Sequence, residues 1–201
     1  MGSPSLRCKG RSLPLYALLP EADALRRRKI SLCLASSLLM LYNTPWLPEH
    51  RSLDDVYMDP SDPTRLYRKQ VYTKPGCGKP QPAPRDSESV DVVDNESIFC
   101  LAIALLELTF GAPLTNFHDS IARQQSGDRL ARLITAKRLT KAIRKHEEER
   151  FASVVIKCMN PPSSSPTEYD FSFENEAFRR QFIKDVLVPL YQDVVALQGG
   201  V

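Results

Sequence analysis

The stretch "SIFCLAIALLELTFGAPL", residues 97–114, joins a continuous apolar run to a helix stop signal. Residues 98–110 are apolar on nearly every face of a helix, which is typical of a helix inside a core rather than at its surface. Gly111 and Pro113 then end the helix, because glycine readily closes a helix and proline cannot continue one. The stretch therefore predicts a buried helix that the other helices surround.

Four further segments repeat apolar residues at helical spacing. They cover residues 21–42, 128–145, 149–160 and 174–197. Thr44-Pro45 ends the first of them, and Pro189 is expected to kink the last. With one short strand expected at residues 56–58, the predicted fold class is mainly α: a helical domain with few short strands and a long irregular loop.

The length of 201 residues fits one domain with a sizeable core. Residues 1–20 contain several prolines and are predicted to be an irregular N-terminal segment, followed by a single helical domain over residues 21–197. Within this domain, residues 59–94 are expected to form a mobile surface loop. Proline and glycine crowd "KPGCGKPQPAP" in that region, and the acidic "DSESVDVVDNES" follows.

Charge and cysteine content exclude several classes of protein. The formal charge of +3 is too small to imply a nucleic-acid partner, and the basic runs at residues 26–29 and 129–150 are better explained as solvated helix faces. The histidines show no metal-ligand spacing, so no metal is expected. The five cysteines are odd in number and three lie in apolar helical runs, which favours reduced thiols.

The apolar stretches are too short for a membrane-spanning helix, which needs about 20 residues. The chain does not begin with the charge, apolar run and cleavage site of a signal peptide. Leu6 occupies the position at which an N-myristoylation signal requires Ser or Thr. We therefore expect a soluble cytoplasmic protein without a membrane span.

Two short patterns approach catalytic or nucleotide-binding motifs but lack essential residues. In "GCGKPQ", residues 76–81, Pro80 replaces the Ser or Thr of a phosphate-binding loop, and Thr73 stands at the first glycine position. Asp54 and Asp55 are adjacent, and neighbouring residues of an extended segment point to opposite faces. We expect a flexible turn and a capping or solvated pair, and assign no catalytic, cofactor-binding or metal-binding residue.

Four stretches carry a resemblance to a known family. They are "LASSLLMLYNTPWLPEHRSLDDVYM", "IFCLAIALLELTFGAPL", "FASVVIKCMN" and "FENEAFRRQFIKDVLVPLYQDV". Their order resembles the C-terminal lobe of protein kinases, and more closely an uncharacterised fungal domain family built on that lobe. In that family the domain often follows HeLo-type or prion-inhibition-and-propagation helical domains. The resemblance implies a helical module for protein binding or regulation in fungal incompatibility or immune-type signalling.

The segment that resembles the kinase catalytic loop departs from the kinase pattern. Counted back without gaps from Val56, His50 stands at the position of the catalytic Asp and Asp55 at that of the metal-binding Asn. No Asp-Phe-Gly motif follows, and only about twenty residues precede the first helix, too few for a nucleotide-binding lobe. The resemblance therefore implies a pseudokinase-like domain that is not an enzyme, needs no cofactor and binds protein.

Three alternatives remain open. The chain could be a degenerate kinase-like enzyme that binds nucleotide and holds a metal through Asp54 or Asp55. It could be a switch in which phosphorylation of Ser87, Ser89 or Ser97 docks the acidic segment on the basic helix around residues 138–144. It could also be an incomplete gene product, in which case apolar surface on the first helix would cause aggregation.

Overall fold

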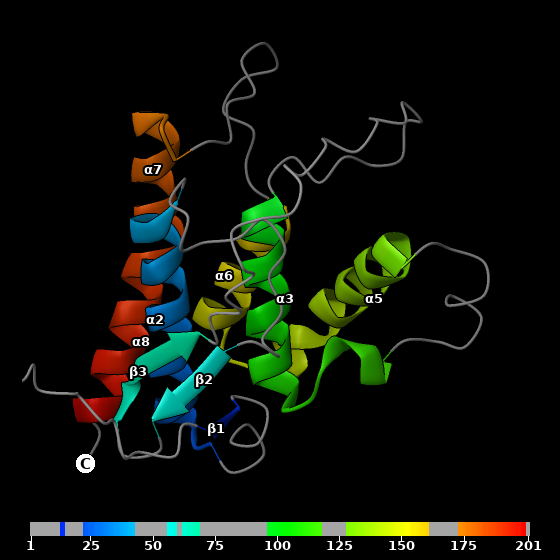
Figure 1. The fold of residues 1–201 in the computed structure, drawn as a ribbon, viewed down its shortest axis with the longest axis horizontal. Coiled ribbons are helices and arrows are strands. Elements are labelled where there is room, and N and C mark those ends of the chain that lie inside the picture. Colours follow the sequence, from blue (N-terminus) through cyan, green and yellow to red (C-terminus); the bar gives the residue numbers. More distant parts are fainter. Residues whose placement is uncertain are drawn as a thin grey trace, which may run out of the picture.

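The computed structural model describes residues 13–14, 22–42, 56–59, 62–68, 96–117, 128–160 and 173–199. These residues are mainly helical, which confirms the predicted fold class (Figure 1). The helical elements are α2 (Ala24–Leu41), α3 (Glu96–Phe110), η2 (Leu114–Phe117), α5 (Asp128–Ala142), η3 (Ile143–Lys145), α6 (Glu149–Met159), α7 (Glu176–Phe182), η4 (Ile183–Leu187) and α8 (Val188–Gly199).

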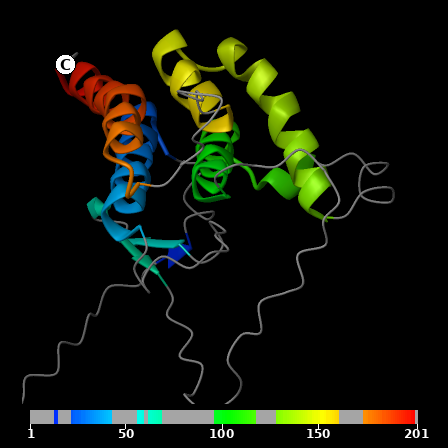
Figure 2. The ribbon, with the colours of Figure 1, turned by 90° about the horizontal axis from the view of Figure 1, so that it is seen from above.

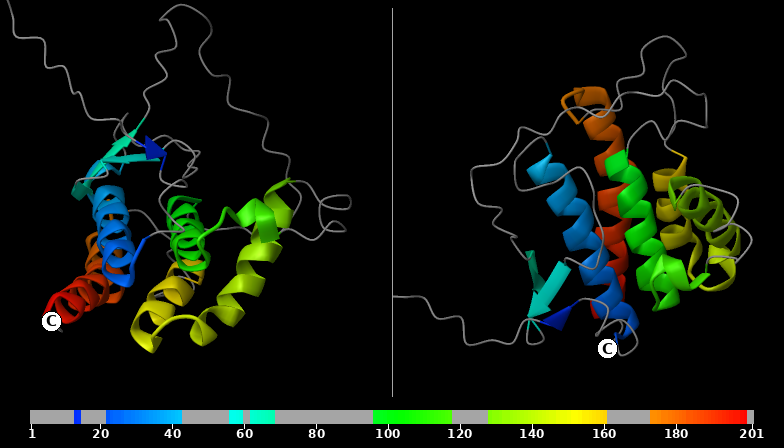
Figure 3. Two further views of the ribbon diagram at one scale, coloured as in Figure 1. Left: turned by 90° about the horizontal axis from the view of Figure 1, so that it is seen from below. Right: turned by 45° about the vertical axis from the view of Figure 1, so that its right-hand side comes forward.

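Helix α3 is the central element of the fold. Every residue from Ile98 to Thr109 is buried, as its continuous apolar sequence predicts. Helices α2, α5 and α6 all pack against it. In Figure 1, α2 and α8 lie on one side of α3, α5 lies on the other, and α6 lies behind it. The right-hand view of Figure 3 shows α2, α8 and α3 next to one another.

Two residues, Gly111 and Glu107, shape the turn after α3. Gly111 has a φ of 66°, the left-handed conformation that glycine adopts without a steric cost. The buried carboxylate of Glu107 reaches past this turn and accepts a hydrogen bond from the Leu114 amide, with 2.8 Å between the two atoms. Glu107 therefore fixes η2 against the end of α3.

Helices α7 and α8 follow one another without a break through the short element η4. The Asn175 side chain caps the start by accepting hydrogen bonds from the amides of Ala177 and Phe178. Element η4 is a π-helical turn, in which the Val188 amide donates to the Ile183 carbonyl. The turn lies just before Pro189, whose ring lacks an N–H and crowds the carbonyl four residues earlier. The sequence predicts a kink at this proline, and the structure has a widened helical turn beside it.

A small antiparallel sheet lies next to α2 (Figure 2). Its strands are β1 (Leu13–Pro14), β2 (Val56–Asp59) and β3 (Asp62–Arg68), in the order β1-β2-β3. Strand β2 confirms the strand predicted at residues 56–58. Strand β3 corrects part of the loop predicted at residues 59–94, because residues 62–68 of that range form a strand that pairs with β2. The rest of that loop, and of the segment 1–20 apart from β1, lies outside the described residues.

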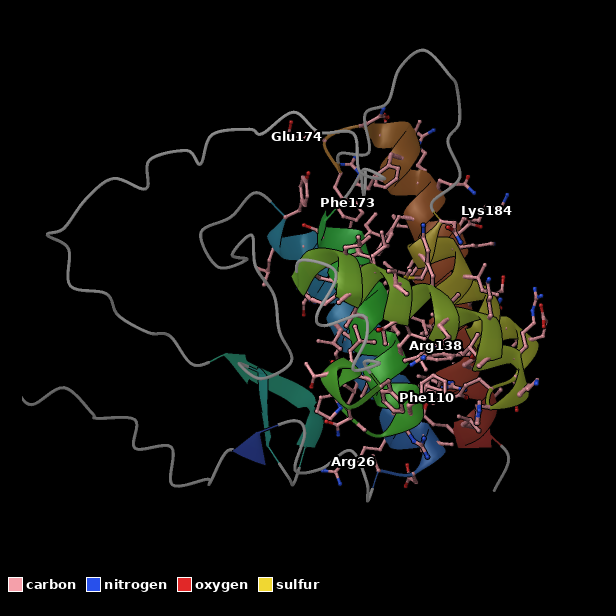
Figure 4. The ribbon with its side chains drawn as sticks, turned by 90° about the vertical axis from the view of Figure 1, so that its right-hand side faces the viewer. Arg26, Phe110, Arg138, Phe173, Glu174 and Lys184 are labelled. Atoms are coloured by element: carbon pink, nitrogen blue, oxygen red, sulfur yellow. The ribbon has the colours of Figure 1, made fainter. Side chains whose placement is uncertain are left out.

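An aromatic cluster joins α2 to α7 at one end of the helices. The ring centroid of Phe173 lies 5.0 Å from that of Tyr42, 5.4 Å from that of Phe178 and 4.8 Å from that of Phe182. Figure 4 shows Phe173 and Glu174 near this end and Arg26 near the opposite end. The cluster fixes the start of α7 relative to the end of α2.

Candidate functional site

The candidate residues from the sequence fall in two groups. His50, Asp54, Asp55, Ser87, Ser89 and the stretch 76–81 lie outside the described residues. Ser97 lies in the first turn of α3, and residues 138–144 lie on α5 and η3. The kinase-like catalytic loop therefore stays a prediction. The described part of the chain offers four other features: a cavity, a buried charged cluster, an exposed apolar face and a group of exposed cations that precedes it.

The cavity lies where α3, α6, α7 and η4 meet. It is lined by Ile98, Lys157, Cys158, Phe178, Gln181, Phe182, Asp185 and Val186. Its volume of about 20 Å³ has room for about one water molecule. Burial raises the pKa of the Cys158 thiol to about 12, and the negative charge of Asp185 acts in the same direction. Cys158 is thus a protonated core thiol at neutral pH, not a nucleophile.

An ion pair between α6 and η4 forms the polar part of the cavity wall. Lys157 Nζ lies 2.8 Å from Asp185 Oδ1, and Gln181 Nε2 donates a hydrogen bond to Asp185 Oδ2. Burial by itself raises the pKa of Asp185. The hydrogen bonds from Lys157 and Gln181, together with the positive charges of Lys157 and Lys184, outweigh this and hold the pKa below its ordinary value. The pair ties the π-helical turn to α6.

A group that we call the Arg28 cluster joins α2, α6 and α8 inside the fold. It consists of Arg28, Glu147, Arg150, Phe151 and Asp193. The side chains of Arg28, Glu147 and Asp193 are only 7%, 11% and 4% exposed. Arg28 Nη2 lies 2.5 Å from Glu147 Oε2, and Arg28 Nε lies 3.6 Å from Asp193 Oδ2. Arg150 Nη1 donates a hydrogen bond of 2.9 Å to Asp193 Oδ1.

The Arg28 cluster corrects one expectation from the sequence. Residues 26–29 were expected to form a solvated basic face, yet Arg28 is buried. Its guanidinium carbon lies 3.7 Å from the centroid of the Phe151 ring. A buried cation requires charge partners and dense packing around it, and Glu147, Asp193 and this ring supply both. The inner side of α8 is therefore fixed to α2 and α6 at Asp193.

The outer side of α8 carries a line of exposed apolar side chains, which we call the outer face. Val188, Tyr191 and Val195 are 42%, 59% and 47% exposed. Their spacing of three and four residues places them on one face of the helix. The opposite face of η4 and α8 buries Val186, Leu190 and Val194. Helix α8 is thus apolar on two faces, and only one of them is covered by the rest of the described fold.

Basic side chains precede the outer face along the same helical segment. Arg179, Arg180 and Lys184 are exposed. Arg180 pairs with Glu176 four residues earlier, at 2.5 Å, and both side chains are exposed. Figure 4 shows Lys184 on the part of the molecule away from the sheet. These cations and the outer face together offer a partner a positively charged strip followed by an apolar one.

Within the described ranges, no group of three or more His, Cys, Asp or Glu side chains is arranged to hold a metal ion. Among the helices that the structure describes, none has the length and apolar content required to cross a membrane. The described cysteines Cys33, Cys100 and Cys158 are reduced thiols, as the sequence predicts for three helical cysteines.

Sequence reasoning missed the Arg28 cluster and the outer face. The outer face has a readable signal: Val188, Tyr191 and Val195 repeat at helical spacing beside a second apolar set at residues 186, 190 and 194. No pattern within a short stretch of the sequence indicates the Arg28 cluster. Arg28 and its partner Glu147 are 119 residues apart, so only the folded chain brings them together.

Comparison with known proteins identifies one family. A family model described as "Domain of unknown function (DUF7580)" matches residues 6–196. No curated protein and no solved structure matches this chain.

Proposed function

Because the chain belongs to the DUF7580 family of domains of unknown function, we propose its function from the surfaces that the fold exposes. It is a non-catalytic helical module that binds another protein through the outer face of α8. The partner is an amphipathic helix with acidic residues on the flank of its apolar strip. The observation that carries this proposal is the exposure of Val188, Tyr191 and Val195 on a helix whose opposite face is already buried.

The spacing of the three outer-face residues favours a helical partner. They extend over two turns, roughly 10 Å along the helix axis, which matches the apolar strip of a short amphipathic helix. Tyr191 is a suitable central anchor, since tyrosine offers a large, stiff contact area and is enriched among residues that dominate binding. Arg179, Arg180 and Lys184 favour a partner with acidic side chains, which increases specificity and the rate of association.

More specifically, we propose that this module is a kinase-like helical lobe with a regulatory role within a fungal signalling protein. The resemblance of its four stretches to the C-terminal lobe of kinases supports this view. The mainly helical fold around a buried α3 is compatible with it. Phosphoryl transfer depends on placing a base, metal ions and a nucleotide together, and "Pro48-Glu49-His50" stands where the resemblance would require the catalytic loop.

A peptide selection tests the proposed function. The folded chain is used to select binders from a displayed library of helical peptides, and each binder is then measured against the triple variant Val188→Ser, Tyr191→Ala and Val195→Ser. We expect selected peptides to carry apolar residues at helical spacing with acidic neighbours. Their affinity for the triple variant should fall at least tenfold, the size of about one hot-spot side chain lost from an interface.

The matched control is Ile134→Ser, which removes an exposed apolar side chain on α5 instead. This variant should bind the selected peptides with unchanged affinity. All four substitutions are at exposed positions, so the variants should melt as cooperatively as the parent chain. Selected peptides that bind the parent and the triple variant equally well would remove the outer face from consideration.

A further inference from the structure

The start of α3 lies against the segment that leads into α8. Ile98, in the first turn of α3, lines the cavity together with Phe178, Gln181 and Asp185 of α7 and η4. The right-hand view of Figure 3 shows α3 beside the continuous segment from α7 to α8. Lys184 directly precedes Asp185 in the chain. The residues that precede α3 are therefore tethered next to η4 and its lysine.

Lys184 is the cation that lies nearest along the chain to the outer face. Its side chain is exposed, and Val188 follows four residues later, about one helical turn away. The neighbouring carboxylate of Asp185 is already paired with α6, and Arg180 is paired with Glu176. Among the residues that the structure describes, Lys184 has no ion-pair partner. An occupant of the outer face therefore meets this positive charge at the η4 end.

The chain contains a segment with the matching chemistry directly before α3. Residues 86–95, "DSESVDVVDN", carry four carboxylates, three valines and no cation. Counted backwards from Glu96, the first residue of α3, the acidic Asp94 comes first and the valines at residues 90, 92 and 93 come next. Lys184 and the outer face follow one another in the same order along η4 and α8.

We propose that residues 86–95 of the same molecule occupy the outer face. Asp94 then pairs with Lys184. The valines cover Val188 and Tyr191. This inference rests on the proposed function and adds regulation to it, because the segment competes with the partner helix for one surface. The proposed partner combines an apolar strip with acidic flanks, and the segment offers both kinds of side chain.

The segment is long enough for this contact. Val90 precedes Glu96 by six residues, which extend over at most about 20 Å. Lys184 and Tyr191 are seven residues apart, about 10 Å along a helix. Alternate side chains of an extended chain share one side, so Val90 and Val92 can face α8 together. Because the tether gives the segment a high effective concentration, individually weak contacts are sufficient.

Zero-length cross-linking of the complete chain tests the contact directly. A carbodiimide joins a carboxylate to a lysine only where the two groups touch, and peptide mass spectrometry identifies each pair. We expect residues 86–95 to be joined to Lys184. The controls are Lys141 and Lys145, which are also exposed. They lie near the last residue of α3, whose ring contacts that of His146. An absence of links to Lys184, or links mainly to the control lysines, would overturn the proposal.

The triple variant Val188→Ser, Tyr191→Ala and Val195→Ser separates docking on the outer face from simple charge attraction. It keeps Lys184 and every carboxylate of the segment. If the valines hold the segment on α8, the yield of links to Lys184 should fall about fivefold, as expected when a weak apolar contact is lost. An unchanged yield would mean that charge alone brings the segment to Lys184, and the proposal would be wrong.

Isotope labelling separates docking within one molecule from docking between molecules. A mixture of labelled and unlabelled chains is cross-linked, and each link should join a segment and a lysine of like labelling. Links between labelled and unlabelled peptides would assign the contact to a second copy of the chain and contradict the proposal.

The affinity for a partner helix distinguishes this inference from the proposed function. The selected peptides are measured against the parent chain and against the variant Val90→Ser, Val92→Ser and Val93→Ser, which keeps the charge of the segment. If the segment covers the face in about four of five molecules, the variant should bind about fivefold more tightly. Equal affinities, with the outer face still required for binding, would refute occupation by the segment and leave the proposed function intact. If no peptide requires the outer face, the proposed function fails, and the cross-links to Lys184 alone decide this inference.

Discussion

Arg28 shows how a charged side chain from a basic run becomes a core residue. Three of its neighbours in the cluster, Glu147, Phe151 and Asp193, come from other parts of the chain and surround the guanidinium group. A buried ion pair of this kind stabilises a fold less than its Coulomb energy suggests, because both charges must leave water. Removing Arg28, however, takes its cation away from the buried carboxylates of Glu147 and Asp193, of which Asp193 keeps its pair with Arg150.

The substitution Arg28→Ala is therefore expected to destabilise the fold strongly. It leaves the carboxylates of Glu147 and Asp193 without this partner, at a cost of about 3–5 kcal/mol. At roughly 2–4 °C per kcal/mol for a chain of this size, the Tm should fall by about 6–20 °C. Thermal and urea unfolding measure the loss.

Lys29→Ala is the matched control for Arg28→Ala, because Lys29 is the next residue of α2 and is only partly buried. It should lower the Tm by far less than Arg28→Ala. Similar losses for the two variants would mean that the cluster contributes little beyond the helix itself.

Cys158 is expected to resist thiol reagents while the chain is folded. Burial and the nearby charge of Asp185 raise its pKa to about 12, so almost no thiolate exists at neutral pH. Cys33 is partly exposed and should react before Cys158. Alkylation near pH 8 followed by peptide mass mapping gives the order of reaction. In concentrated urea both cysteines should be modified, and early modification of Cys158 in the folded chain would contradict the assignment.

Asp185 should make the stability depend on pH in the acidic range. Its pKa is lower in the folded chain than its ordinary value of 3.8. Its ionised form thus stabilises the fold above that value, and this contribution is lost as the pH falls through the lower folded pKa. The Tm difference between the parent and Asp185→Asn should be largest near neutral pH and shrink below about pH 4. Glu176→Gln, at an exposed pair, should give a small difference throughout.

At the scale of single elements, Gly111 ends α3 in the left-handed conformation that favours glycine. Gly111→Ala should destabilise the fold by about 1 kcal/mol, because a residue with a side chain resists a positive φ. No atom lies within 4 Å of an added Cβ, so steric overlap adds nothing to this cost. Gly111→Asn should cost less, since asparagine tolerates this conformation. Urea unfolding of both variants checks the order, and equal losses would point to another cause.

The sequence predicts the helices better than it predicts their details. Apolar periodicity places α2, α3, α5, α6 and the segment from α7 to α8 correctly, since each buries a regular stripe or, for α3, all faces. It does not place the π-helical turn at residues 183–187, because that turn depends on how the backbone adapts beside Pro189. Strand β3 was also missed, since its charged and proline-containing sequence "DPTRLYR" has the composition of a loop.

Sequence reasoning does not find a candidate site whose residues lie far apart in the chain. The outer face lies on a single helix, so its spacing is visible in the sequence once the helix is known. The Arg28 cluster combines residues of α2, α6 and α8 and the residue Glu147, and no local pattern predicts such a meeting. Whether a charged side chain is solvated or buried is decided by its partners in the folded chain.

At the scale of the whole molecule, the proposed function predicts the response to nucleotide. Thermal unfolding with ATP and magnesium or manganese should give the same Tm as unfolding without them. A ligand at a hundred times its Kd would stabilise the fold by about 2.7 kcal/mol, a shift of several degrees for a chain of this size. A titratable increase in Tm that disappears in Asp55→Ala would instead favour the degenerate nucleotide-binding enzyme.

The packing of α2 against α8 has a consequence for synthesis in the cell. The first and last helices of the described fold pack against each other, but the ribosome synthesises α2 long before α8. At about 5–20 residues per second, α8 follows α2 after roughly 10–30 s. During that time the apolar side of α2, including Ile30, Ala35 and Leu38, lacks the cover that α8 supplies, so we expect the nascent chain to be a client of ribosome-associated chaperones.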